Sequence, residues 1–188
     1  MFRLRWVLVA LVLMSMMTVL AGGSVSAQGA TPISVPSPTA AGCEQVPAYA
    51  EERQKLMDEL LSGISAIFPD VATPVTEHGD DLTIAMFAMT PEQTRQLGEL
   101  YDGIAEKLEK LDVPEIAKFY NAQVAALYRL SGKAFEEAAT TDLMTAGQKY
   151  GEQLGAVAVA VGDYGAAAVV VCPAFSAVVK IDQTQIGL

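Results

Sequence analysis

The stretch Leu143–Cys172, LMTAGQKYGEQLGAVAVAVGDYGAAAVVVC, is the most apolar part of the chain beyond its N-terminal run, and it ends in one of only two cysteines. Its residues form a seam with alternating spacings of three and four, which is typical of a helix packed in a bundle. We therefore expect a bundle helix here. The seam consists of two series of residues seven apart: Leu143, Tyr150, Val157, Tyr164 and Val171, and Gly147, Leu154, Val161 and Ala168.

Three glycines lie four apart in this stretch, at Gly147, Gly151 and Gly155, and so share one face of the expected helix. Glycine costs about 1 kcal/mol of helix propensity relative to alanine. We expect that a neighbouring helix approaches closely at these positions.

Two other interpretations of the same stretch remain open. Val157 to Val161 and Ala166 to Val171 flank Gly162-Asp163-Tyr164-Gly165, a sequence that also suits the turn of a hairpin. Leu154 to Val178 carries a single charge, Asp163, which is compatible with a membrane span. Pro173 and the glycine-rich interruption argue against a span.

The N-terminus has the features of a secretory signal peptide. Two arginines precede the apolar run from Trp6 to Leu20, and Val25-Ser26-Ala27 is a site of small residues suited to cleavage. We expect residues 1–27 to be removed and the protein to be secreted or extracytoplasmic. The alternative is a signal that stays uncleaved and anchors the protein in the membrane; otherwise we expect no stable span in the mature chain.

Removal of residues 1–27 takes away two arginines and no acidic residue, so the formal net charge changes from −10 to −12. A chain this acidic repels phosphate backbones, which excludes nucleic acid as a partner. Residues 28–42 contain three prolines and no charge, and we expect a disordered or extended linker.

The two cysteines, Cys43 and Cys172, stand at the two edges of the expected structured region, residues 43–175. A disulfide is the usual state of two cysteines in an exported chain. In an up-down-up-down four-helix bundle the start of the first helix and the end of the fourth lie at the same end. We therefore predict a Cys43–Cys172 disulfide.

Three further helices are expected from apolar periodicity. The first spans about Pro47 to Phe68, with Arg53 among the residues expected to face water. The second begins at Thr90, where Pro91 and Gln93 complete a capping box, and includes an exposed Glu106–Lys110 pair. The third begins after Asp112 and ends near Ala139. Residues 176–188 form a tail that either packs back in an extended conformation or frays.

These elements predict an all-α fold, an up-down-up-down four-helix bundle with one long connection between the first two helices. That connection, Pro69 to Met89, contains the only histidine, His78, beside Glu77, Asp80 and Asp81. One imidazole and three carboxylates are suitable ligands for a divalent cation, although a polar turn is the simpler interpretation. Met86 and Met89 follow and are expected to pack in the core.

No catalytic arrangement is visible in the sequence. His78 is the only candidate base, no G-x-S-x-G supplies a nucleophile, and no haem or di-iron motif occurs. Glutamates recur every seven residues at Glu92, Glu99 and Glu106, which we interpret as a solvated face. We expect a non-enzymatic module without a cofactor that binds an unknown protein or small ligand, with a metal-binding protein using the His78 loop as the alternative.

Overall fold

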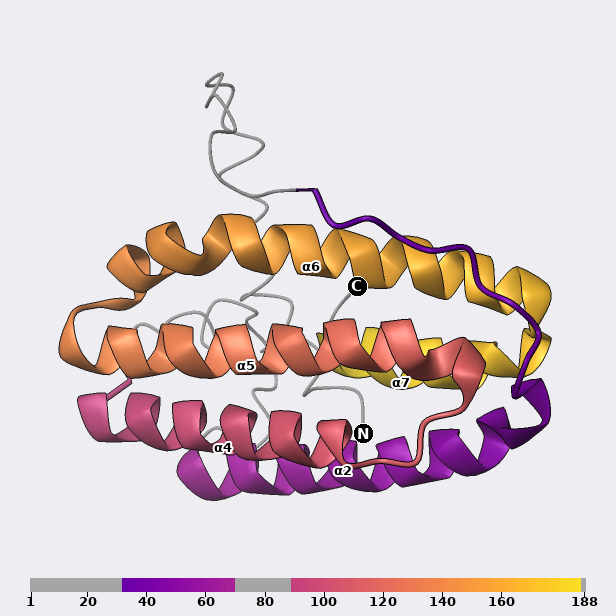
Figure 1. Ribbon diagram of the computed structural model, residues 1–188. Helices are drawn as coiled ribbons and strands as arrows, with labels where there is room; N and C mark the ends of the chain where they lie inside the picture. Colours follow the sequence, from indigo (N-terminus) through magenta and orange to yellow (C-terminus); the bar gives the residue numbers. More distant parts are fainter. Residues whose placement is uncertain (1–31, 70–88, 187–188) are drawn as a thin grey trace, which may run out of the picture.

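The chain folds as a layered set of helices in the computed structural model, which describes residues 32–69 and 89–186. No strand occurs within these ranges, and successive helices run antiparallel (Figure 1). Short 3-10 helices precede three of the helices: η1 (Cys43–Gln45), η2 (Glu115–Ala117) and η3 (Pro173–Phe175). Five α-helices pack together: α2 (Val46–Ile67), α4 (Pro91–Glu109), α5 (Lys118–Thr140), α6 (Leu143–Val171) and α7 (Ser176–Ile186).

The helix starts follow from local capping. The Thr90 side chain accepts a hydrogen bond from the Gln93 amide, and the Gln93 side chain accepts one from the Thr90 amide, so the predicted capping box is confirmed. Asp142 caps α6 by accepting from the Thr145 amide at 2.8 Å, and this hydrogen bond lowers the pKa of Asp142. Both caps satisfy amides that have no partner within their own helix.

The helix α6 is continuous through Gly162 and Gly165, so the hairpin interpretation is wrong. The inner side of this segment explains why. The Tyr164 hydroxyl donates to the Ile116 carbonyl at 2.7 Å, and Gly165 lies where a Cβ would be 3.1 Å from the Tyr120 ring. Gly165 therefore allows close packing against α5 and does not form a turn.

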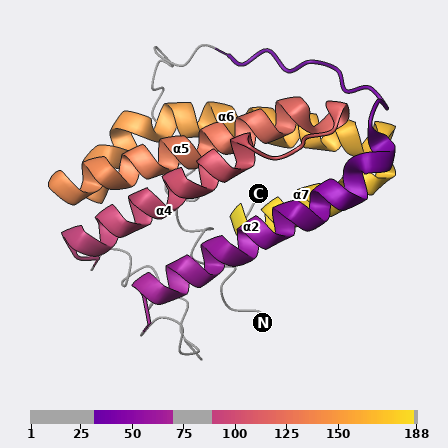
Figure 2. The same cartoon turned by 60° about the horizontal axis from the view of Figure 1, so that its bottom comes forward.

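The tail forms a fifth helix, neither extended nor frayed over residues 176–186. Helix α7 packs on α2 (Figure 2), and Phe175 and Val178 are fully buried. The expectation of four helices therefore omitted α7. Its apolar positions were too few to show a period in the sequence, but they fill the space beside α2.

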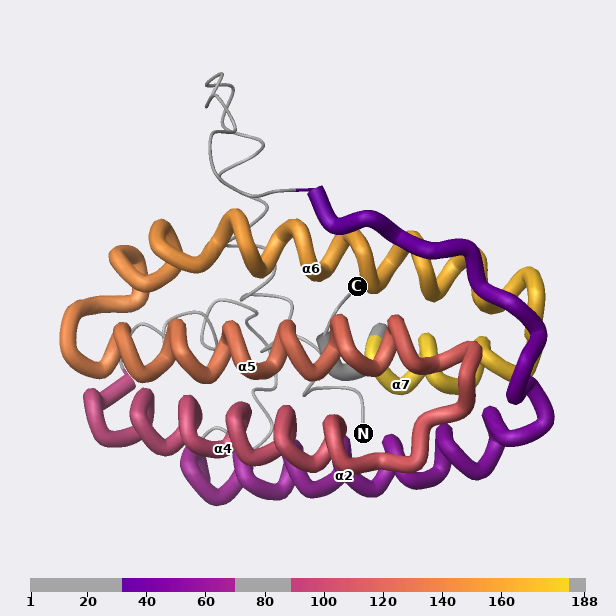
Figure 3. The backbone as a smooth tube through the Cα atoms, in the orientation of Figure 1, coloured from indigo at the N-terminus to yellow at the C-terminus, as the bar shows by residue number. Residues whose placement is uncertain are grey.

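The predicted disulfide is present. Cys43 and Cys172 are bonded, with their Cα atoms 5.8 Å apart. The bond ties the start of α2 to the end of α6, which lie at the same end of the molecule (Figure 3). Beside it, Gly42 has a φ of 80° and lies where a Cβ would be 3.0 Å from the Glu115 amide nitrogen, so only glycine fits the turn.

The described part of the proline-rich segment, residues 32–42, runs beside α6 towards the disulfide (Figure 3). Ile33 and Val35 are half-buried and pack against the core. The Ala41 carbonyl accepts from the Ile116 amide at 3.0 Å. The expected extended linker is thus part of the folded structure from Pro32 onward.

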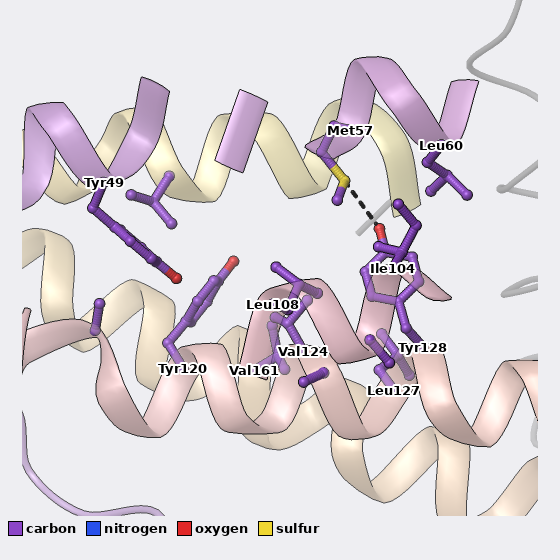
Figure 4. Close-up of a cluster of buried hydrophobic side chains, with 14 of the residues drawn as sticks. Tyr49, Met57, Leu60, Ile104, Leu108, Tyr120, Val124, Leu127, Tyr128 and Val161 are labelled. Atoms are coloured by element: carbon purple, nitrogen blue, oxygen red, sulfur yellow. Dashed lines mark hydrogen bonds between the residues drawn. The ribbon is translucent and has the colours of Figure 1, made fainter. Parts of the chain in front are cut away.

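Helices α4 and α5 approach each other closely at two glycines, Gly98 and Gly132. A Cβ at Gly98 would lie 3.0 Å from the Gly132 carbonyl, and one at Gly132 would lie 2.8 Å from Asp102 Oδ1. Apolar side chains fill much of the core between α2, α4 and α5 (Figure 4), and the Tyr128 hydroxyl donates to Met57 Sδ at 3.2 Å.

Candidate functional site

A cluster of polar side chains is enclosed between α2, α5 and α7. Arg53 Nη2 lies 2.5 Å from Asp182 Oδ1 of α7. Arg53 Nη1 donates to the Tyr49 hydroxyl at 3.2 Å and to Asn121 Oδ1 at 3.1 Å. Tyr49 in turn donates to Asn121 Oδ1 at 2.8 Å. These four residues, here called the Arg53 cluster, join three helices through one guanidinium group.

Both charges of this ion pair are removed from water. The exposed fractions of the Arg53 and Asp182 side chains are 0% and 1%. Burial by itself lowers the pKa of Arg53, but the negative charge of Asp182 and the hydrogen bond with Tyr49 outweigh it and raise the pKa. The pair is therefore charged in the folded protein, and its stability depends on the hydrogen bonds around it.

Two tyrosines line the guanidinium. The Tyr49 and Tyr120 hydroxyl groups point toward the same space between α2 and α5 (Figure 4). The Arg53 Cζ atom lies 5.8 Å from the Tyr49 ring centre and 5.7 Å from that of Tyr120, within the range of a cation–π contact. Burial, and then the negative charge of Asp182, raise the pKa of Tyr120, so this phenol is neutral.

The prediction that Arg53 faces water is wrong. Tyr49, Arg53 and Met57 follow one another at intervals of four, and all three are buried. The spacing therefore placed Arg53 on the buried face, but its charge argued for the surface. Asp182, the partner that makes burial possible, is 129 residues away and lay in the unassigned tail.

The second feature is the side of α6 that faces away from α5. Its inner side is buried through Val157, Val161, Tyr164 and Ala168. The opposite side, here called the outer face of α6, exposes 63% of Val159 and 83% of Val170. Its other members are small residues at spacings of three and four: Gly155, Gly162 and Ala166.

The expected close approach at Gly147, Gly151 and Gly155 is wrong for the described part of the chain. Nothing there lies within 4 Å of the position that a Cβ would take at these glycines. Gly147 is solvent-exposed, and Gly151 and Gly155 lie on the side of α6 opposite the buried Val157 and Tyr164.

Helix α6 is also the one helix among the described residues that is long and apolar enough to cross a membrane. Its mean hydropathy over the best window is 1.9, and a third of that window is buried inside the protein. The same length and composition are found in core helices of soluble proteins, so the finding concerns composition alone.

The predicted metal loop, with Glu77, His78, Asp80 and Asp81, lies outside the described residues, as does Met86. Within residues 32–69 and 89–186 no group of three His, Cys, Asp or Glu side chains is placed to hold a metal ion. Met89 is half-buried and packs against the core, as expected.

The acidic row on α4 is solvent-exposed, as predicted. Arg95 forms ion pairs with both Glu92 and Glu99, and Lys110 lies 3.8 Å from Glu106. These exposed pairs contribute little stability because water screens them. Each of the three glutamates has a cation on its own helix.

Comparison of the chain with models of protein families, with curated proteins and with solved structures found no match at any of the three levels.

Proposed function

We propose that the protein is an exported, non-enzymatic interaction module that associates with a second copy of itself through the outer face of α6. The signal sequence supports export, with cleavage expected after Ala27. The proposed scaffold is an up-down-up-down core of α2, α4, α5 and α6, to which α7 adds a fifth helix.

The exposed valines of α6 carry this proposal. Val159 and Val170 are among the few large apolar side chains that the described residues leave exposed, and they stand on one helix face with Gly155, Gly162 and Ala166. Helical glycines exposed to water cost propensity and gain no packing. A helix seated on this face would bury the valines and offset that cost.

Charge restricts a second copy to a surface that carries few acidic residues. The mature chain has a formal net charge of −12 after loss of residues 1–27, so two copies repel one another over most of their surfaces. From Gly155 to Val171, α6 carries only Asp163. Two acidic chains can approach closely where both lack charge.

The order of residues on the outer face suits an antiparallel pair. If the two-fold axis of an antiparallel pair passes between Ala158 and Val159, Gly155 faces Gly162 and Gly151 faces Ala166. Each contact then joins two small residues, which lets the two helix backbones approach closely. A two-fold axis relates the contacts, as in most homodimers.

Native mass spectrometry of protein purified from its own host, without added metal or chelator, tests this function. We expect a chain that lacks residues 1–27, has an intact disulfide and forms a dimer. A monomer over the micromolar range would contradict the self-association. A bound divalent metal would instead favour the alternative function of the His78 loop, which remains a prediction.

A variant pair locates the interface. Val159→Asp places a charge on the outer face and is expected to give a monomer with unchanged helix content. The control, Ala66→Asp, places the same charge at an exposed position on α2 and should remain dimeric. Equal dimerisation of both variants would contradict the proposed face. Binding of the wild-type chain to neutral lipid vesicles, lost in Val159→Asp, would identify a membrane surface as the occupant instead.

A further inference from the structure

The Arg53 guanidinium uses only part of its hydrogen-bonding capacity. Its Nη2 atom bonds Asp182 Oδ1, but Nε has no hydrogen-bond partner in the described structure, and neither has Asp182 Oδ2. All these atoms are enclosed. A carboxylate that faced the Nε–Nη2 edge squarely would bond both nitrogens. Asp182 bonds Nη2 through a single oxygen and leaves Nε without a partner in the described structure.

The other side of the Arg53 cluster is held without any contribution from α7. Asn121 Nδ2 donates to the Leu108 carbonyl of α4 at 2.8 Å, which fixes the amide. Asn121 Oδ1 then accepts from both Tyr49 and Arg53 Nη1. Because these bonds join α2, α4 and α5 alone, the guanidinium keeps its orientation whatever lies at its Nε–Nη2 edge.

Asp182, by contrast, comes from the shortest of the five helices. Helix α7 has 11 residues, follows the disulfide-bonded Cys172, and packs chiefly on α2 and η3. Its Asp182 carboxylate reaches an oriented cation bordered by the Tyr49 and Tyr120 rings. A carboxylate at this position meets a fixed guanidinium beside the Tyr120 phenol, while the Asn121 amide and the Tyr49 hydroxyl hold the guanidinium in place.

We propose that the Arg53 cluster is a binding site for small monocarboxylates, and that Asp182 occupies it as an internal ligand carried on a displaceable α7. Monocarboxylates are favoured over polyanions because the strongly acidic chain repels multiple negative charges. This site is independent of the outer face of α6.

Chemical rescue tests the receptor. Asp182→Ala removes the internal carboxylate from the full chain and leaves Arg53 without its ionic partner. We expect formate or acetate in the millimolar range, at constant ionic strength, to raise the melting temperature of this variant. Formate has three non-hydrogen atoms, so its Kd should be no tighter than about 1 mM.

The control ligand is formamide, which has a similar shape but no charge and should give no rise. The control variant is Arg53→Leu/Asp182→Ala, which lacks the cation and should not respond to formate. Equal stabilisation by formamide, or by formate in the double variant, would overturn the proposal. So would the absence of any formate effect on Asp182→Ala.

The wild-type chain tests the displacement of α7 even if Asp182→Ala fails to fold. Saturating acetate should accelerate amide hydrogen exchange in α7 several-fold while α4 and α5 stay protected. Sodium chloride at the same ionic strength serves as the control. If acetate leaves the exchange of α7 unchanged, Asp182 is a permanent structural partner and the proposed receptor role is wrong.

Discussion

The α4–α5 interface and the outer face of α6 both place glycines on a helix surface, with opposite results. At Gly98 and Gly132 the two backbones meet so closely that a Cβ would lie 3.0 Å or less from the opposite helix. At Gly151 and Gly155 the space that a Cβ would take has no neighbour among the described residues.

The difference lies in the residues that accompany the glycines. Next to Gly98 and Gly132, Tyr101 makes tilted ring contacts with Tyr128 and Phe135, with ring centres 5.4–5.5 Å apart, and these contacts bring α4 and α5 together. On α6 the bulky seam residues stand on the side opposite Gly151 and Gly155. Glycine therefore permits a close approach, but large apolar neighbours on the same face provide the free energy for it.

Removal of the disulfide is expected to cause the largest loss of stability. The bond has a sequence separation of 129 residues, so the double variant Cys43→Ala/Cys172→Ala should lose up to about 4–5 kcal/mol of unfolding free energy. We expect amide exchange to accelerate most in α7 and the last turns of α6, because the bond anchors both to α2.

Urea unfolding and hydrogen exchange measured on the same sample check this prediction, with the oxidised wild-type chain as the control. Equal acceleration throughout α4 and α5 would mean that the five helices open as one unit. The α4–α5 interface would then open together with α6 and α7, and not separately from them.

The second-largest loss of stability is expected at alkaline pH, from buried tyrosines at the α4–α5 interface. Burial raises the pKa values of Tyr101 and Tyr128 above the ordinary value of 10.0. Above pH 10 the unfolded chain binds fewer protons than the folded chain, so stability is full below pH 10 and falls as the pH rises. One pH unit above 10, each tyrosine should account for a loss of unfolding free energy on the order of 1 kcal/mol.

The pH dependence of urea unfolding measures this loss, and Tyr101→Phe should reduce its slope. Phenolate absorbance should appear for these two tyrosines only together with unfolding. Their titration near pH 10 in a chain with intact helices would show that the interface admits water.

Alanine substitutions at the two kinds of glycine should give smaller effects of opposite sign. Gly132→Ala forces a Cβ to within 2.8 Å of Asp102 Oδ1 and 3.0 Å of the Gly98 carbonyl, and should cost about 1–3 kcal/mol. Gly151→Ala meets open space and should gain up to about 1 kcal/mol from helix propensity.

Each variant is the control for the other, and urea unfolding at a concentration where the chain is monomeric compares them. A destabilising Gly151→Ala would contradict the open outer face, and a neutral Gly132→Ala would contradict the close contact of α4 with α5.

Much of the fold could be predicted because its signals are local. The Thr90 capping box, the apolar stripe of α4 and the pairing of Cys43 with Cys172 needed only residue spacing and the ends of the helices. The candidate sites were harder to predict. The Arg53 cluster depends on a partner far along the chain, and the exposure of α6 depends on which neighbours its two sides meet.

The sequence by itself determined the helices, their antiparallel succession and the bond between their ends, because these follow from periodicity, caps and short links. Only the tertiary structure decided the burial of Arg53, the helical tail and the open side of α6. A charge can be buried when a distant residue such as Asp182 supplies a counter-charge. A glycine face remains open when the bulky residues of the same helix bury the opposite side instead.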